Sequence, residues 1–273
     1  MINADSAQVY ADLQILSARP SEEEMQGVPH RLFGTWDASE ACSAADWAEA
    51  ARKEVAEAHA AEALPILVGG TGLYIRTLLD GIAPVPLIDP QVREEVRALP
   101  VAEAYAALER EDPEKAAVLN PADTTRVARA LEVIRSTGRT LADWQTNRTG
   151  GIGADVSVKP VILLPDRAWL YERCDRRFAQ MVEQGALDEV AALLSRKLDE
   201  KLPAMRAIGV PELADYLSGH TTLEQAIATG QQATRNYAKR QYTWLRHQLP
   251  AHWPRFDSKN YFPDDAVEIL FHQ

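Results

Sequence analysis

Two short stretches carry side chains that could perform chemistry at the ends of buried strands. Asp5 and Ser6 follow the apolar segment 1–4, and a carboxylate there can act as a general base or cap the turn that follows. Thr71 follows two glycines after the apolar run 66–68, an arrangement that can form an anion or ligand site. Many such turns bind nothing, so a purely structural interpretation of each stretch stays open.

Basic side chains at helical spacing could bind phosphate. Arg173 and Arg177 lie one turn apart and could clamp a phosphate, although the neighbouring acids could equally form surface ion pairs with them. Arg126 and Arg129 could lie on a face that is simply solvated. For both pairs, the spacing leaves binding and solvation as alternatives.

The last long helical segment, 222–247, is basic and amphipathic. One of its stripes consists of Arg235, Lys239, Tyr242 and Arg246. Glu224 is the only acid between residues 217 and 256. Cations interleaved with aromatic rings and almost free of acids favour a polyanion as the partner over a solvated face.

Apolar patterning and capping residues predict the elements that must position these groups. The unbroken apolar runs 66–68 and 158–164 indicate strands buried on both faces, as in a parallel sheet. Ser43 and Asp46 form a capping box at the start of a helix. Helices are predicted over 43–63, 122–139, 166–185 and 222–247. A strand, a helix and a strand in succession at the beginning of the chain predict a βαβ unit.

Composition narrows the class of protein. The chain has 273 residues and a formal net charge of −11, which argues against indiscriminate nucleic-acid binding but allows a local basic channel. Its two cysteines, Cys42 and Cys174, lack metal-ligand spacing and are expected to be reduced thiols. Without a leader or a membrane-length apolar stretch, a cytoplasmic location is expected.

Seven segments together resemble the tRNA dimethylallyltransferases of bacterial type, the IPP transferase family. They are 5–10 (Asp-Ser-Ala-Gln-Val-Tyr), 29–32, 43–47, 67–74 (Leu-Val-Gly-Gly-Thr-Gly-Leu-Tyr), 126–133, 205–209 and 234–246. The resemblance covers nearly the whole chain, and its specificity comes from the order of the segments and from the final helix.

The resemblance implies an α/β fold of the P-loop NTPase type, with a parallel sheet, flanking helices and an inserted helical domain. It implies transfer of a dimethylallyl group from dimethylallyl diphosphate to N6 of adenosine 37, in tRNAs that read codons beginning with U. The target base is flipped out of its stack, and Mg²⁺ assists departure of the diphosphate. It further implies a monomer that binds the anticodon stem-loop and no membrane.

By the same resemblance, Asp5 is the general base and Thr71 also belongs to the catalytic site. The residues expected to contact tRNA are Asp5, Ser6, Ala7, Gln8, Thr71, Arg93, Thr125, Arg126, Val127, Ala128, Arg129, Arg206, Ala207, Ile208, Gly209, Val210, Pro211, Glu212, Lys239 and Arg246. The arginines expected near the diphosphate are Arg173, Arg177, Arg235 and Arg240. No residue is expected to bind metal directly.

One departure concerns the diphosphate cradle. The family begins with a strand and a Gly-x-x-x-x-Gly-Lys-Ser/Thr loop, and this sequence contains no such motif. We therefore expect the first strand and phosphate loop to be missing, which would leave an unpaired sheet edge. The expected core is 1–84 with 125–273, and the inserted tRNA-binding region is 85–124. A smaller departure is Val210-Pro211, where many relatives carry an aromatic and a basic residue.

Three alternatives follow from these observations. The missing phosphate loop favours a non-catalytic tRNA-binding remnant. An isopentenyltransferase acting on free adenine nucleotides would share the reaction, but it would not need the basic final helix. A fragment of a small-molecule kinase would share the fold class.

Overall fold

The computed structural model describes residues 1–257, which divide into two compact units. The α/β unit comprises residues 1–78 and 153–257, and the helical unit comprises residues 79–152. None of the described helices is long and apolar enough to cross a membrane.

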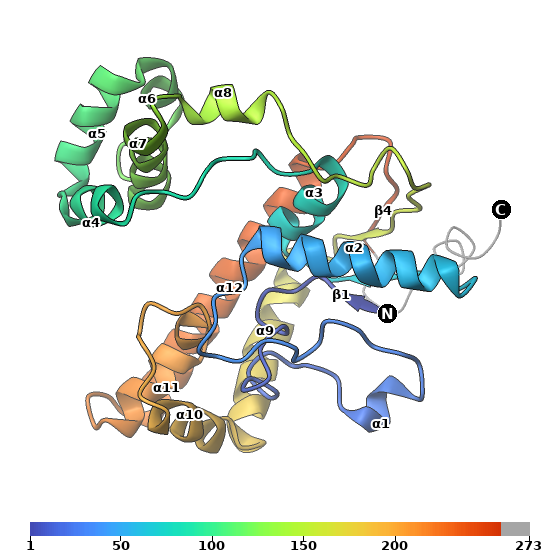
Figure 1. Cartoon of the computed structure of the whole chain (residues 1–273). Coiled ribbons are helices and arrows are strands. Elements are labelled where there is room, and N and C mark those ends of the chain that lie inside the picture. Colours follow the sequence, from blue (N-terminus) through green and yellow to red (C-terminus); the bar gives the residue numbers. More distant parts are fainter. Residues whose placement is uncertain (258–273) are drawn as a thin grey trace. The chain divides into compact units, whose positions relative to one another are not determined.

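Four short strands of the α/β unit form two parallel pairs (Figure 1). β1 (Ile2–Asn3) pairs with β2 (Leu67–Val68), and β3 (Ile162–Leu163) pairs with β4 (Arg255–Phe256). The expected parallel arrangement is therefore present, but each strand has only two residues.

The expectation that both apolar runs are buried on both faces is wrong. Val68 is 42% exposed and Leu163 is 46% exposed. Among the described residues, β2 pairs only with β1 and β3 pairs only with β4.

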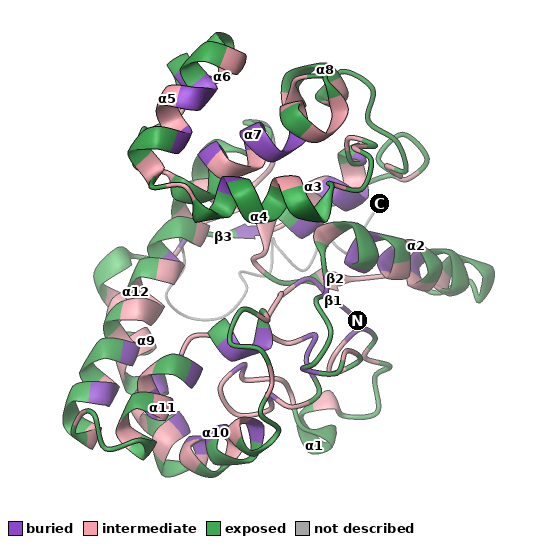
Figure 2. Ribbon diagram, turned by 60° about the vertical axis from the view of Figure 1, so that its left-hand side comes forward, coloured by how far each residue is buried: buried purple, intermediate pink, exposed green. Residues whose placement is uncertain are grey.

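Helices, joined by long loops, also belong to the α/β unit. They are α1 (Glu22–Met25), α2 (Ala44–Ala60), α3 (Gly72–Asp80), α9 (Arg167–Glu183), α10 (Ala186–Ser195), α11 (Val210–Leu217) and α12 (Leu223–His247), with a 3-10 turn at Ala204–Arg206. The capping box predicted at Ser43 and Asp46 is confirmed at the start of α2. The buried residues of α2 recur every three or four positions (Figure 2), and the indole N–H of Trp47 donates to the carbonyl of Asn3 in β1 at 2.8 Å.

Two long helices, α9 and α12, lie side by side (Figure 1). Gly230 of α12 faces Phe178 of α9, and any side chain at Gly230 would overlap with the phenyl ring. A glycine is therefore required where the helices approach closely. The basic residues of α9 and α12 therefore belong to one closely packed pair of helices.

The helical unit contains α4 (Pro90–Ala98), α5 (Val101–Glu111), α6 (Pro113–Val118), α7 (Thr124–Thr137) and α8 (Leu141–Gln145). Its core includes Val96, Leu108, Val127 and Leu131. The segment expected to be the insertion, 85–124, lies inside this unit, which extends further because the apolar face of α7 packs on α4 and α5. The helix predicted over 122–139 is confirmed and ends at Gly138, whose φ is 69°.

Candidate functional site

Asp5 lies immediately after β1 and is held by the buried side chain of Asn3. The Asn3 amide donates to the carbonyls of Asp5 and Leu32, both at 3.0 Å, and its oxygen accepts from the backbone N–H of Asp5 at 2.8 Å. Oδ1 of Asp5 accepts from the N–H of Ala7 at 2.8 Å. The carboxylate therefore does cap the following turn, while its second oxygen makes no hydrogen bond among the described residues.

Thr71 joins the glycine turn to the segment that carries Asp5. Its Oγ1 accepts from the N–H of Ser6 at 3.0 Å and lies 3.3 Å from the Ser6 hydroxyl. Its own N–H donates to the carbonyl of Ala4 at 3.1 Å. The structure thus brings together the two stretches that the sequence singled out, and it gives Thr71 the contacts of a positioning residue.

The glycines beside Thr71 permit close packing. A side chain at Gly70 would overlap with Gln241, and one at Gly72 would overlap with the ring of Trp244. Gly69 similarly lies against the backbone of Ala4. Side chains of α12 therefore pack directly against this turn, which fits the structural interpretation that the sequence left open.

Gln8 and Arg177 both contact the loop that follows the Asp5 turn. The Gln8 amide donates to the carbonyls of Ser17 and Ala18 at 3.0 and 3.1 Å, and Arg177 donates to Ser17 at 3.5 Å. Desolvation lowers the pKa of Arg177, whereas the nearby Asp5 carboxylate acts in the opposite direction. Arg177 is nevertheless cationic at neutral pH, so a cation and a carboxylate lie close together.

Glu189 of α10 clamps the turn that leads into this loop. Its Oε2 accepts from the N–H groups of Gln14 and Ile15, both at 2.7 Å, and its Oε1 accepts from Leu16 at 2.9 Å. Our sequence reasoning missed this contact, because no local signal links residues more than 170 positions apart.

Three of the four arginines expected near the diphosphate act electrostatically on Cys174. Burial raises the pKa of the Cys174 thiol, and the charges of Arg177, Arg235 and Arg173 act to lower it. Arg235 also forms an ion pair with Asp175, so part of its charge is neutralised. The fourth, Arg240, is not among the charges that act on Cys174 and lies over the ring of Tyr237.

The segment expected to contact tRNA before α11 is only partly accessible. Gly209 and Val210 are buried, and the N–H of Gly209 donates to Glu212 at 2.8 Å. Arg206 and Pro211 are exposed, whereas Ala207 and Ile208 are partly covered. Val210 therefore cannot offer its side chain to a ligand.

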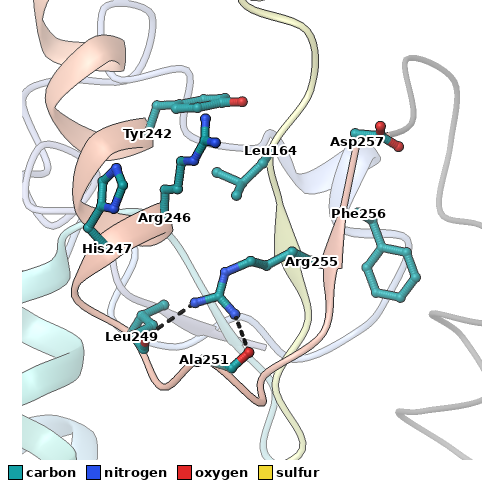
Figure 3. A pocket seen from close by; sticks show the side chains of 9 residues that line it. All are labelled: Leu164, Tyr242, Arg246, His247, Leu249, Ala251, Arg255, Phe256 and Asp257. Atoms are coloured by element: carbon teal, nitrogen blue, oxygen red, sulfur yellow. Dashed lines mark hydrogen bonds between the residues drawn. The ribbon is translucent and has the colours of Figure 1, made fainter.

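The end of α12 borders an open hollow of about 730 Å³ (Figure 3). Lys239 and Arg246 are exposed on this helix, and Arg246 lines the hollow. Arg255 lies there as well, but its guanidinium donates to several backbone carbonyls, including those of Leu249 and Ala251. Arg255 thus has a structural function that the sequence did not reveal.

In the helical unit, Arg93 and Arg129 both approach the carboxylate of Glu132, at 3.9 and 3.8 Å. Arg126 is exposed and pairs with Asp123 at 2.8 Å. Thr125 is exposed and Ala128 is partly covered, but Val127 is fully buried in the core. Val127 is therefore corrected from a tRNA contact to a core residue.

Metal-ligating side chains do not cluster in residues 1–257, where no group of three or more His, Cys, Asp or Glu could hold an ion. Mg²⁺ commonly uses one or two carboxylates and several oxygens from substrate phosphates.

Comparisons with known proteins identify the family. The family model described as IPP transferase matches residues 8–248. A tRNA dimethylallyltransferase of Novosphingobium aromaticivorans is 69% identical over 270 residues, covering 99% of this chain and 96% of that protein. One from Erythrobacter litoralis is 62% identical over 271 residues, covering 99% and 86% respectively.

Solved structures are similar as well. The full-length tRNA isopentenylpyrophosphate transferase from Bacillus halodurans has a TM-score of 0.67 and 37% identity, covering 98% of this chain and 85% of that chain. A eukaryotic dimethylallyltransferase acting on tRNA has a TM-score of 0.72 and 26% identity, covering 89% and 62%.

Proposed function

The chain belongs to the IPP transferase family, and we propose that it transfers a dimethylallyl group from dimethylallyl diphosphate to N6 of adenosine 37 in tRNAs that read codons beginning with U. The observation that carries this proposal is the Asp5 carboxylate, which Asn3 and Ala7 hold at the end of β1 with one oxygen unpaired. A fixed carboxylate can accept a proton from an exocyclic amine as the new bond forms.

The reaction has a simple balance of bonds. The nitrogen of N6 forms a bond to C1 of the dimethylallyl group, and the bond between C1 and the diphosphate oxygen breaks. The N6 proton moves to Asp5, and the electron pair of the broken bond leaves with the diphosphate. Arg173, Arg177 and Arg235, which act together on Cys174, support stabilisation of that leaving group.

Mg²⁺ belongs to the same proposal and would neutralise charge on the diphosphate oxygens. The P-loop NTPase type of fold, a monomeric state and a cytoplasmic location are also parts of it. Among the residues proposed to contact tRNA, those with accessible, positively charged side chains are Arg93, Arg126, Arg129, Arg206, Lys239 and Arg246. Thr71 and Gln8 would act mainly by positioning the Asp5 turn.

The decisive experiment combines a transfer assay with a binding assay. The full chain is incubated with dimethylallyl diphosphate, Mg²⁺ and tRNA, and N6-isopentenyladenosine is quantified by mass spectrometry of the digested nucleosides. We expect Asp5→Asn to lower kcat by about 10²- to 10⁴-fold, as is usual for loss of a general base, while tRNA binding is retained.

Asp155→Asn provides the matched control, because Asp155 is an exposed carboxylate of the same unit without a hydrogen bond or ion pair. It should leave kcat unchanged. A wild-type chain that binds an anticodon stem-loop without any transfer would contradict the proposal and support a tRNA-binding remnant. Modification of free adenine nucleotides in preference to tRNA would contradict the proposed substrate.

A further inference from the structure

A single glutamate lies buried in the otherwise apolar face of α7. Glu132 is 1% exposed and is flanked in sequence by Leu131 and Val133, which are fully buried. Burial of an ionised carboxylate is unfavourable unless cations compensate it. The function of Glu132 must therefore be sought in the groups that face it.

Three arginines from two helices surround this carboxylate. Arg97 of α4 donates to Oε1 at 2.7 Å, whereas Arg93 of α4 and Arg129 of α7 lie 3.9 and 3.8 Å from Oε2. Oε2 is buried and has no hydrogen-bond partner. One carboxylate thus attracts three guanidinium groups but forms a hydrogen bond with only one of them.

The three arginine side chains are exposed to solvent, whereas the Glu132 carboxylate between them is buried. Their exposed fractions are 60% for Arg97, 50% for Arg93 and 41% for Arg129. Three cations and one anion leave a formal charge of +2 on the cluster. Such an exposed, concentrated charge is suited to the phosphates of a nucleic acid.

A contact that only stabilised the packing of α4 on α7 would not need three arginines. The bond between Arg97 and Glu132 joins the two helices without help. Desolvation lowers the pKa of Arg129, and the charges of Arg93 and Arg97 act in the same direction, whereas Glu132 acts to raise it. The three cations therefore repel one another. Stability alone therefore does not explain why Arg93 and Arg129 lie beside Arg97. Binding of an external anion would explain it.

We propose that Glu132 is a positioning residue that holds Arg93, Arg97 and Arg129 together for the backbone phosphates of the tRNA substrate. The proposal rests on the proposed function and adds two residues to it, Arg97 as a phosphate ligand and Glu132 as the group that orders the three guanidiniums. Neither residue stood out in the sequence, although Arg93 and Arg97 have the i, i+4 spacing of one helix face.

The test depends on whether Glu132→Gln weakens or strengthens tRNA binding. Glu132→Gln removes a negative charge near a polyanion, so electrostatics alone would strengthen binding. If Glu132 positions the arginines, this variant should instead bind an anticodon stem-loop about fivefold more weakly, with a smaller dependence of log Kd on log salt. The KM for tRNA should rise, while the KM for dimethylallyl diphosphate should not change.

Two further variants keep the test decisive. Arg97→Gln should weaken binding and reduce the salt slope by about one, and it serves even if Glu132→Gln does not fold. Arg110→Gln is the matched control, because Arg110 is an exposed arginine of α5 outside the cluster. Circular dichroism and the thermal midpoint confirm that each variant is folded.

The outcomes separate this inference from the proposed function. Folded Glu132→Gln or Arg97→Gln that binds as well as Arg110→Gln would overturn the inference, even with an active wild type. A wild type that binds tRNA without transfer would overturn the proposed function, while the binding comparison would still decide the inference. A wild type that binds no stem-loop would overturn both.

Discussion

Replacement of Glu189 by glutamine is expected to destabilise the α/β unit far more than an ordinary surface substitution. The carboxylate accepts three backbone N–H groups from residues 14–16, at distances of 2.7 to 2.9 Å. Glutamine has nearly the same size, so the change tests these hydrogen bonds and leaves packing almost unaltered. Ser17 and Ala18, whose carbonyls receive Gln8, follow the clamped turn directly.

The magnitude follows from what an amide can accept. With its oxygen in the place of Oε2, glutamine keeps the bonds from Gln14 and Ile15 but turns its NH₂ toward the N–H of Leu16. Hydrogen bonds to charged groups contribute about 1.5–3 kcal/mol, and neutral ones about 0.5–1.5 kcal/mol. Two bonds weakened by about 1–1.5 kcal/mol each and one lost bond of about 1.5–3 kcal/mol predict a loss of about 3.5–6 kcal/mol if the site excludes water, and a smaller loss where water reaches the half-buried carboxylate.

Urea unfolding followed by tryptophan fluorescence measures this loss, and Glu183→Gln is the control, since Glu183 is exposed and makes no hydrogen bond. The variant should still fold, because Arg196 binds Asp12 and Asp37 and ties the end of α10 to the same part of the chain. A free energy of unfolding within about 0.5 kcal/mol of the control, the range of ordinary surface changes, would refute the reasoning. We also expect a lower kcat, because Gln8 and Arg177 depend on the adjoining loop.

Two other perturbations test the packing and the electrostatics of the fold. Gly72→Ala should cost about 1–3 kcal/mol, as overpacking does, because the added methyl overlaps with the Trp244 ring; an unchanged thermal midpoint would contradict this. In the helical unit, the hydrogen bond from Arg135 lowers the pKa of Glu111. The pair therefore stabilises the unit above the unfolded pKa of about 4.3, and that stabilisation is lost as the pH falls. Glu111→Gln should reduce the stability at pH 7 and flatten its decline toward acid, and parallel acid limbs in urea titrations would rule the effect out.

Features that depend on contacts within a few residues could be predicted from the amino-acid sequence. The capping box of Ser43 and Asp46 and the terminal Gly138 place the ends of α2 and α7, because capping hydrogen bonds form within one helical turn. The ordered motifs likewise identified the family, and they predicted that Asp5 and Thr71 share a site, whose two turns are in contact through Ser6 and Thr71. Family resemblance was necessary for the reaction itself, since a carboxylate after a strand does not specify a substrate.

Contacts between residues far apart in the sequence could be established only from the folded structure. The glycine turn at Thr71 is in close contact with Gln241 and Trp244 of α12. Val127 and Val210 lie inside recognisable motifs, yet their side chains are buried. A motif specifies residue types along the chain, whereas burial depends on which distant element packs over each residue.

The two acids with the most consequential contacts show the same limit. Glu189 and Glu132 looked like ordinary charged residues of amphipathic helices. The structure gives the first to a turn more than 170 residues away and the second to three arginines from two helices. Helix periodicity predicts which residues share a face. The fold of the whole unit decides which groups contact that face, and those contacts could not be predicted for either glutamate.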